Sequence, residues 1–141
     1  MNTLAQCPLC HPTDETVVWE DQKLRVILVD EADYPGYFRV IWKEHAIEMT
    51  DLIKEDQLHF MHVVLLAEMI LRQFYKPDKV NLASLGNQVP HLHWHVIARW
   101  EDDPHYPNPI WGEQLRFSCP VRPTLTCQQL MMVFGENLAD Q

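Results

Sequence analysis

The chain has 141 residues, of which 47% are hydrophobic and 22% charged, and its formal net charge is −9. This length suits one globular domain with its own core, and the composition excludes a disordered chain. The acidic balance argues against a general binder of nucleic acid polymers, because such proteins normally carry a basic face. We therefore predict a single domain over residues 1–141, with a core at about 7–100 and a C-terminal extension at 101–141.

The N-terminal stretch MNTLAQCPLC has no basic segment followed by an apolar run, so it does not read as a secretory signal. The longest apolar stretch, VVLLAEMIL, is broken by Glu68 and is too short to span a bilayer. We expect a cytoplasmic protein with no membrane partner. Thiols stay reduced in that compartment, so the four cysteines are not expected to form structural disulfides.

The strand pattern comes first along the chain. Runs rich in β-branched residues at 15–21 and 23–31 predict a hairpin, and residues 37–42 predict a third strand after the YPGY turn. Two further strands are predicted at 79–85 and 91–99, joined by the loop GNQVP. With the helices described next, these elements predict an α+β domain with an antiparallel sheet of about five strands and helices on one side.

One long helix is predicted from about Lys54 to Tyr75. A short helix is expected to begin at Thr126, in a capping box with Gln129, and to stop at Gly135. Between these helices the acidic, proline-rich stretch EDDPHYPNPIW predicts an extended segment over the surface.

The long helix carries two apolar stripes. The first has helical spacing and is expected to pack on the sheet: Phe60, Val63, Val64, Ala67, Ile70, Leu71 and Phe74. The second consists of Leu58, Met61, Leu65 and Met69. It indicates either a helix buried deep in the core or a contact between two copies of the chain.

The stretch PHLHWHVIAR places three histidines at alternate positions. In a strand such side chains share one face, so His91, His93 and His95 would line one surface at intervals of about 6–7 Å. Imidazoles can ligate a metal, transfer protons near neutral pH or attack as nucleophiles. The spacing alone does not choose between metal and covalent chemistry.

The stretch GNQVPHLHWHVIAR resembles the signature of the histidine triad (HIT) family, and in particular a bacterial branch of it. The upstream stretch DQKLRVILVDEADYPGYFRVIWKEHAIEMTDL is similar in the same order, so the resemblance covers about Cys7 to Arg99. It implies a HIT-like domain, a nucleotide substrate and a homodimer. It also implies cleavage at the α-phosphate of a nucleotide conjugate, such as a diadenosine polyphosphate or a nucleoside phosphoramidate, through a covalent nucleotidyl-histidine. No organic cofactor is implied.

The same resemblance implies a role for each histidine. His93 would attack the α-phosphorus, His95 would contact the phosphate and help the leaving group, and His91 would support His93. His45 matches a fourth histidine that the family places near the triad.

Three further residues are candidates for substrate binding by the same resemblance. Asn81 would lie near the nucleotide, Asn87 would reach a phosphate oxygen, and Asp30 would meet the ribose hydroxyls. Ordinary turn chemistry is the alternative for the two asparagines. Trp111 would either cover the base or simply pack against the protein.

The stretch CPLC has the spacing of a metal-binding hairpin, although no second such pair exists in the chain. Some HIT proteins hold zinc with such a pair and two histidines, which here would be Cys7, Cys10, His45 and His91. Two sulfurs and two nitrogens form a closed site, so the zinc would be structural. This hypothesis competes with one in which His45 and His91 form a hydrogen-bond relay to His93.

Two other functions remain open at this stage. A zinc-dependent hydrolase could use the three histidines as its metal site. A nucleotide-binding module with little turnover is the third possibility, since fold similarity does not guarantee activity.

Overall fold

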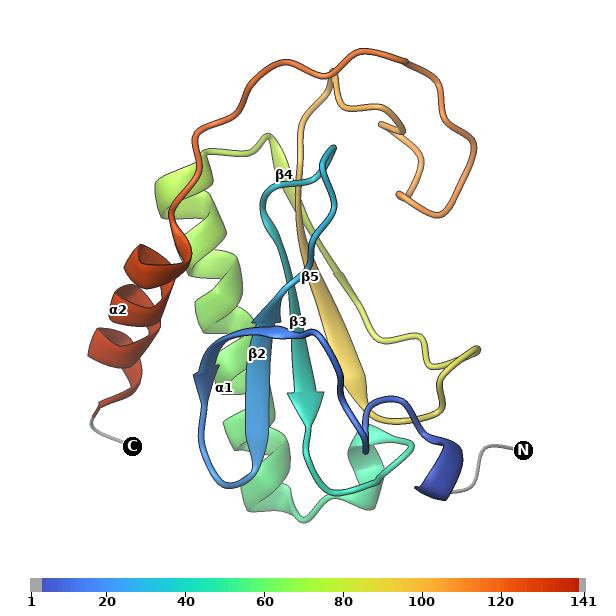
Figure 1. The fold of residues 1–141 in the computed structure, drawn as a ribbon, viewed down its shortest axis with the longest axis vertical. Coiled ribbons are helices and arrows are strands. Elements are labelled where there is room, and N and C mark those ends of the chain that lie inside the picture. The colour runs from blue at the N-terminus through green and yellow to red at the C-terminus, as the bar shows by residue number, and fades with distance from the viewer. Residues whose placement is uncertain (1–3, 140–141) are drawn as a thin grey trace.

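Five strands form one antiparallel sheet in the order β1-β2-β3-β5-β4 (Figure 1). Their bounds are Thr16–Glu20 (β1), Leu24–Leu28 (β2), Tyr37–Trp42 (β3), Lys79–Ala83 (β4) and His93–Arg99 (β5). The computed structural model describes residues 4–139. The predicted α+β class and the five-stranded antiparallel sheet are confirmed.

The long helix also follows the prediction. Helix α1 spans Lys54–Ile70 and runs directly into a π-helical turn, η3, at Leu71–Tyr75. Lys76 then adopts a left-handed backbone with φ 52°, and Pro77 cannot continue a helix. Two short 3₁₀ turns, η1 at Leu4–Gln6 and η2 at Met49–Asp51, complete the N-terminal half.

The C-terminal helix begins as predicted but ends later. Helix α2 spans Cys127–Leu138, and Thr126 and Gln129 form the predicted capping box. The predicted stop at Gly135 is wrong, because this glycine lies inside the helix. A glycine costs a helix only about 1 kcal/mol, and the buried side chains of Phe134 and Leu138 hold the last turn against the core.

Both helices cover the same face of the sheet (Figure 1). Alternate residues of the central strands, such as Phe38, Val40, Val96 and Ala98, are fully buried in the main core on that face. The intervening residues of β3 and β5 therefore project from the opposite face, which carries no long helix within residues 4–139. Turns and loops cover much of this second face, where Tyr37 and Ile97 are buried in a small cluster with Tyr34 and Ile110.

The two stripes of α1 differ in exposure. Five residues of the sheet-facing stripe are at most 1% exposed on α1 and Leu71 is buried on η3, whereas Leu58, Leu65 and Met69 are 66%, 50% and 47% exposed. Of the two alternatives for this stripe, burial of these three residues deep in the core is therefore wrong for the single chain, whereas a contact between two copies stays a prediction.

Across residues 4–139, every helix is too short or too polar to span a membrane.

The start of the C-terminal extension also differs from the prediction. Residues 101–112 fold into successive turns instead of an extended segment. The reason is Asp103, whose fully buried carboxylate accepts backbone N–H groups from Trp100, His105 and Tyr106. The chain becomes extended only after these turns and then leads into α2.

Candidate active site

Strand β5 begins at His93, so His91 lies just before the strand. The prediction that all three histidines alternate along one strand is wrong in this respect. His93 and His95 project from the face of the sheet opposite the helices, with ring centroids 5.0 Å apart. The His91 ring instead turns toward the N-terminal cysteines.

The position of the proton on His93 follows from its hydrogen bond. Its Nδ1 lies 2.6 Å from the carbonyl oxygen of His91, which can only accept, so Nδ1 carries the proton. Nε2 of His93 is therefore an unprotonated lone pair. Burial lowers the pKa of this imidazole, and the nearby Arg39 cation lowers it further. The ring stays neutral near pH 7 and can act as a nucleophile.

His95 lies next to two aromatic side chains, those of Tyr37 and Trp111. Its Nδ1 is 2.8 Å from the hydroxyl oxygen of Tyr37, and its ring centroid is 4.9 Å from that of Trp111. Burial, then the neighbouring His93 and Arg39, lower the pKa of His95 to about 4. This imidazole is therefore also neutral near pH 7.

A hollow of about 350 Å³ lies over the two imidazoles. The lining residues are Leu9, Arg39, Leu85, Gly86, Asn87, Gln88, Val89, His93, His95 and Trp111. The loop of residues 85–89 thus lines the same hollow as the two imidazoles. Its backbone N–H groups and the Asn87 amide, together with the Arg39 cation, are groups suited to an anion.

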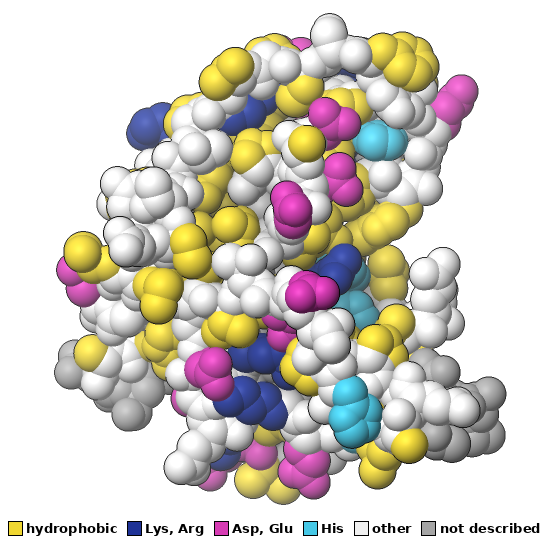
Figure 2. All heavy atoms as spheres, in the orientation of Figure 1, with side chains coloured by type: hydrophobic (Ala, Val, Ile, Leu, Met, Phe, Trp, Pro, Cys, Tyr) yellow, Lys and Arg dark blue, Asp and Glu magenta, His cyan; other side chains and the backbone are white. Residues whose placement is uncertain are grey.

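Arg39 is the functional candidate that the sequence analysis missed. It pairs with His95 in the β3–β5 register, so the two side chains leave the sheet side by side. Among residues 4–139 its Nε has no hydrogen-bond partner, and no carboxylate lies within ion-pair distance of its guanidinium. Figure 2 shows basic and histidine side chains next to each other right of centre. One signal was available, namely a basic residue in the middle of the apolar run YFRVIW.

Asp30 lies beside a second hollow, of about 300 Å³, on the far side of Arg39. The exposed Asp30 side chain does not line the hollow that contains the imidazoles. Arg39 lines both hollows, so they are neighbours on the same face. A ligand long enough to fill both would meet Asp30 at one end.

Asn81 is held by a structural contact. Its side-chain oxygen accepts a hydrogen bond of 2.8 Å from Arg99, and the residue does not line the hollow above His93. It lines an open depression that Trp111 shares. Asn81 is thus separated from Asn87, and Trp111 lies between their two hollows.

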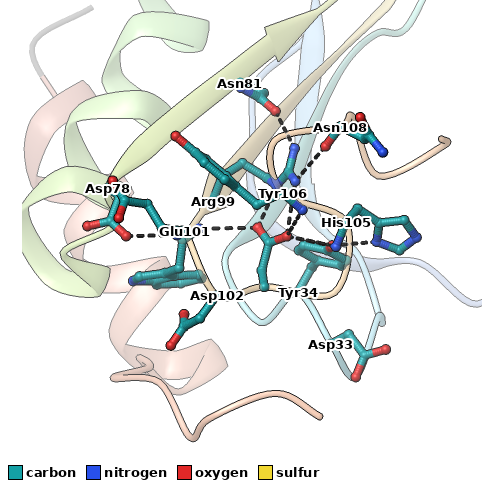
Figure 3. Close-up of polar contacts among 12 residues, drawn as sticks. Asp33, Tyr34, Asp78, Asn81, Arg99, Glu101, Asp102, His105, Tyr106 and Asn108 are labelled. Carbon is teal, nitrogen blue, oxygen red and sulfur yellow. Dashed lines mark hydrogen bonds and ion pairs between the residues drawn. The ribbon is translucent and has the colours of Figure 1, made fainter. Parts of the chain in front are cut away.

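A buried ion pair fixes the turns that carry Trp111 (Figure 3). Arg99 donates 2.7 and 3.0 Å hydrogen bonds to Asp103, and another to the carbonyl oxygen of Asn108. Burial alone would raise the pKa of Asp103, but the bonds from Arg99 and from backbone N–H groups outweigh it and bring the pKa to about 2. The Tyr34 hydroxyl also donates to this carboxylate.

One group of side chains within residues 4–139 is arranged to share a metal ion. The ligand atoms of Cys7, Cys10, His45 and His91 all lie within 4.8 Å of one another, and the cysteines are free thiols. The His91 Nδ1 lies 3.3 and 3.4 Å from the two sulfurs, and the His45 Nδ1 lies 3.3 Å from the sulfur of Cys10. The four residues therefore fit a closed site with two sulfur and two nitrogen ligands.

The other nitrogen of His91 supports this arrangement. Nε2 lies 2.5 Å from the carbonyl oxygen of Trp42, so it carries the proton and leaves Nδ1 free to ligate. The ring of His91 thus faces the cysteines, while its backbone carbonyl holds His93. His93 and His95 do not belong to this group, so the three histidines of the triad do not converge on one ion.

The sequence of residues 11–102 matches the HIT domain. The match spans more than half of the chain, which therefore belongs to the histidine triad family. Proteins of this family bind nucleotides and include hydrolases and transferases. No relative among curated proteins matches the chain.

Several solved structures share the fold. A histidine triad protein from Bradyrhizobium japonicum is 31% identical, with a TM-score of 0.65, and the match covers 74% of this chain and 80% of that one. One from Marinobacter aquaeolei is 28% identical, with a TM-score of 0.69 and 90% of each chain covered. A protein from Mycobacterium smegmatis described as Zn-bound is 20% identical, with a TM-score of 0.62 over 98% and 96% of the two chains.

Proposed function

We propose that this protein is a nucleotidyl hydrolase or transferase that acts at the α-phosphate of a nucleotide conjugate. The observation that carries the proposal is the bond between Nδ1 of His93 and the His91 carbonyl, which leaves a lone pair on Nε2 of a residue that lines the same hollow as Arg39 and Asn87. Diadenosine polyphosphates and nucleoside phosphoramidates are the substrate classes that we expect.

The proposed reaction has two steps. In the first, Nε2 of His93 attacks the α-phosphorus and forms a covalent nucleotidyl-histidine while the leaving group departs. In the second, water or another acceptor attacks the same phosphorus and frees His93. Arg39, Asn87 and the backbone of residues 85–89 would hold the phosphate oxygens, and His95 would contact the leaving group.

The test is a comparison of the wild-type protein with His93→Ala. We expect wild-type protein incubated with a radiolabelled adenosine 5′-phosphoramidate to form an acid-labile nucleotidyl adduct, and the variant to form none. Turnover should fall by more than about 10³-fold, because a nucleophile is lost. A variant that keeps full activity with an unchanged circular dichroism spectrum would rule out the covalent mechanism.

We further propose a structural zinc ion bound by Cys7, Cys10, His45 and His91. The fit of the donor set supports this proposal, as does the similar fold of a histidine triad protein described as Zn-bound. Bound zinc would add folding free energy and tie the N-terminal segment to the residue that precedes the triad strand. No proton or phosphate transfer would pass through it.

Metal analysis with an activity assay separates this hypothesis from a zinc-dependent hydrolase. We expect about one zinc per chain, and a Cys10→Ser variant should bind less zinc and melt at a lower temperature. Turnover measured promptly after chelation should persist while the protein remains folded. Immediate loss of turnover, restored by zinc without any change in folding, would instead favour a catalytic metal.

A nucleotide-binding module with little turnover is distinguished by a different result, namely tight binding of AMP without cleavage of any conjugate in a substrate panel.

We propose a cytoplasmic homodimer, in which the exposed stripe of Leu58, Leu65 and Met69 forms the contact. Sedimentation at micromolar concentration should give the dimer mass, and Leu65→Glu should give the monomer mass.

A further inference from the structure

Tyr37 is a buried tyrosine that the reaction described above does not use. Its hydroxyl oxygen lies 2.8 Å from Nδ1 of His95, 58 residues away in sequence, and the two side chains are 3% and 6% exposed. Either the Tyr37 hydroxyl donates to Nδ1, or Nδ1 carries a proton and donates to the Tyr37 oxygen. The first arrangement puts an N–H at Nε2 of His95, and the second puts a lone pair there.

The hydrogen-bond requirements of the buried groups favour the first arrangement. In the second, the hydroxyl proton of Tyr37 needs another acceptor, and within the described residues His95 is the one acceptor paired with this hydroxyl. In the first, only lone pairs of the oxygen lack a partner, which costs less than an unpaired buried donor. Burial raises the pKa of the Tyr37 hydroxyl, so the proton needed for this bond is retained.

Arg39 favours the same arrangement. Its guanidinium carbon lies 5.6 Å from the centroid of the Tyr37 ring, on the same face of β3. A positive charge there attracts the lone pairs of the hydroxyl oxygen and repels its proton. The hydroxyl proton is therefore directed away from Arg39 and toward His95.

We propose that Tyr37 is a positioning residue that holds His95 with its proton on Nε2, so that His95 donates a hydrogen bond to the oxygen leaving the α-phosphorus. This inference rests on the proposed function. It gives the two neighbouring imidazoles opposite tautomers: the His91 carbonyl makes His93 present a lone pair, and the Tyr37 hydroxyl makes His95 present an N–H.

The step needs no proton transfer from His95. A bond forms between Nε2 of His93 and phosphorus, and the bond from phosphorus to the leaving oxygen breaks with its electron pair on that oxygen. The N–H of His95 remains on its nitrogen and stabilises the developing negative charge. The stabilisation is larger for a more basic leaving oxygen, because its charge is less delocalised.

This dependence on the leaving group provides the first test. We would measure kcat/KM of wild type and Tyr37→Phe for the phenyl and the 4-nitrophenyl esters of AMP. The variant should lose at least about tenfold more activity on the phenyl ester, whose leaving oxygen is more basic. Tyr75→Phe is the matched control, because its buried hydroxyl accepts from the backbone N–H of Leu125 in the helix-side core and does not contact His95. It should leave the ratio of the two esters unchanged.

Equal losses on the two esters in Tyr37→Phe, or no loss on either, would overturn the proposal. The second test is independent of turnover: ¹⁵N NMR of the imidazole nitrogens should show His95 protonated at Nε2 in wild type and as a mixture of tautomers in Tyr37→Phe. A wild-type proton on Nδ1 would overturn the proposal even if His93→Ala supports the covalent mechanism. If wild type cleaves neither ester, the NMR result alone decides the role of Tyr37, and the proposed function is decided separately by the assay with adenosine 5′-phosphoramidate.

Discussion

Arg39 shows how one residue changes the character of the site. The chain carries a net charge of −9, so a phosphate ligand approaches an acidic protein. A guanidinium without a carboxylate partner among residues 4–139, placed next to His95, reverses this potential locally. It also helps to keep both imidazoles neutral, since it lowers the pKa of each. In the proposed reaction, the attraction of the substrate and the neutrality of the attacking imidazole would therefore depend on the same cation.

The prediction for this residue concerns affinity. Arg39→Gln should weaken the binding of AMP by roughly 10- to 100-fold, because a hydrogen bond to a charged group contributes about 1.5–3 kcal/mol. Isothermal titration calorimetry would measure the change. Arg72→Gln, which removes the same charge from the exposed surface of η3, is the control and should bind AMP as wild type does. Equal affinity in all three proteins would show that Arg39 does not contact the phosphate.

The elements of the fold place these residues by different means. Strands β3 and β5 pair side by side and bring Tyr37, Arg39, His93 and His95 together. The turns after β5 have no such ladder, and they are held by the buried pair of Arg99 with Asp103. A rigid sheet therefore forms the floor of the site, whereas one ion pair positions its aromatic wall.

We predict that Asp103→Asn loosens this wall. The substitution leaves the Arg99 cation buried without its counter-charge, which typically costs about 3–5 kcal/mol. Amide hydrogen exchange of residues 100–112 should accelerate. Exchange in β3 should accelerate only as far as the loss of global stability requires. Unchanged exchange in both segments would mean that other contacts hold Trp111 in place.

Two glycines, Gly135 in helix α2 and Gly36 just before β3, give predictions about the stability of the protein. Gly135 lies inside the helix, and a Cβ built there meets nothing within 4 Å, so Gly135→Ala should raise the free energy of unfolding by about 0.5–1 kcal/mol. Gly36→Ala should lower it by about 1–3 kcal/mol, because the new Cβ would lie 2.9 Å from that of Ala98. Urea denaturation would measure both changes, and a loss of stability in Gly135→Ala would contradict the prediction.

Across the whole molecule, local patterns in the sequence predicted the elements, and contacts between distant segments decided the site. The run YFRVIW and the capping box at Thr126 specify a strand and a helix start from neighbouring residues alone. The contact between Tyr37 and His95 joins residues 58 positions apart, and no periodicity encodes it. The spacing of Cys7 and Cys10 indicates a metal-binding hairpin by itself, whereas His45 and His91 became metal-site candidates only through the family resemblance, since no spacing relates them to the cysteines.

The same distinction explains the end of helix α2. Glycine often ends helices, which predicts a stop at Gly135, but the buried side chains of Phe134 and Leu138 extend α2 past it. Asn81 is a substrate-binding candidate through the family resemblance alone, and no local pattern encodes the bond that its oxygen accepts from Arg99, 18 residues away.

Burial of a neutral His95 makes the stability of the whole molecule depend on pH. The pKa of this imidazole is about 4 in the folded protein and near 6.5 in the unfolded chain, so between these values only the unfolded chain binds the proton. The free energy of unfolding should therefore fall as the pH drops from 6.5 toward 4, by about 3 kcal/mol in total from this group. Thermal or urea unfolding at several pH values, with chelator present throughout, would compare wild type with His95→Asn. The variant should show a smaller slope than wild type in this window, and identical slopes would mean that the folded protein protonates His95 as readily as the unfolded chain.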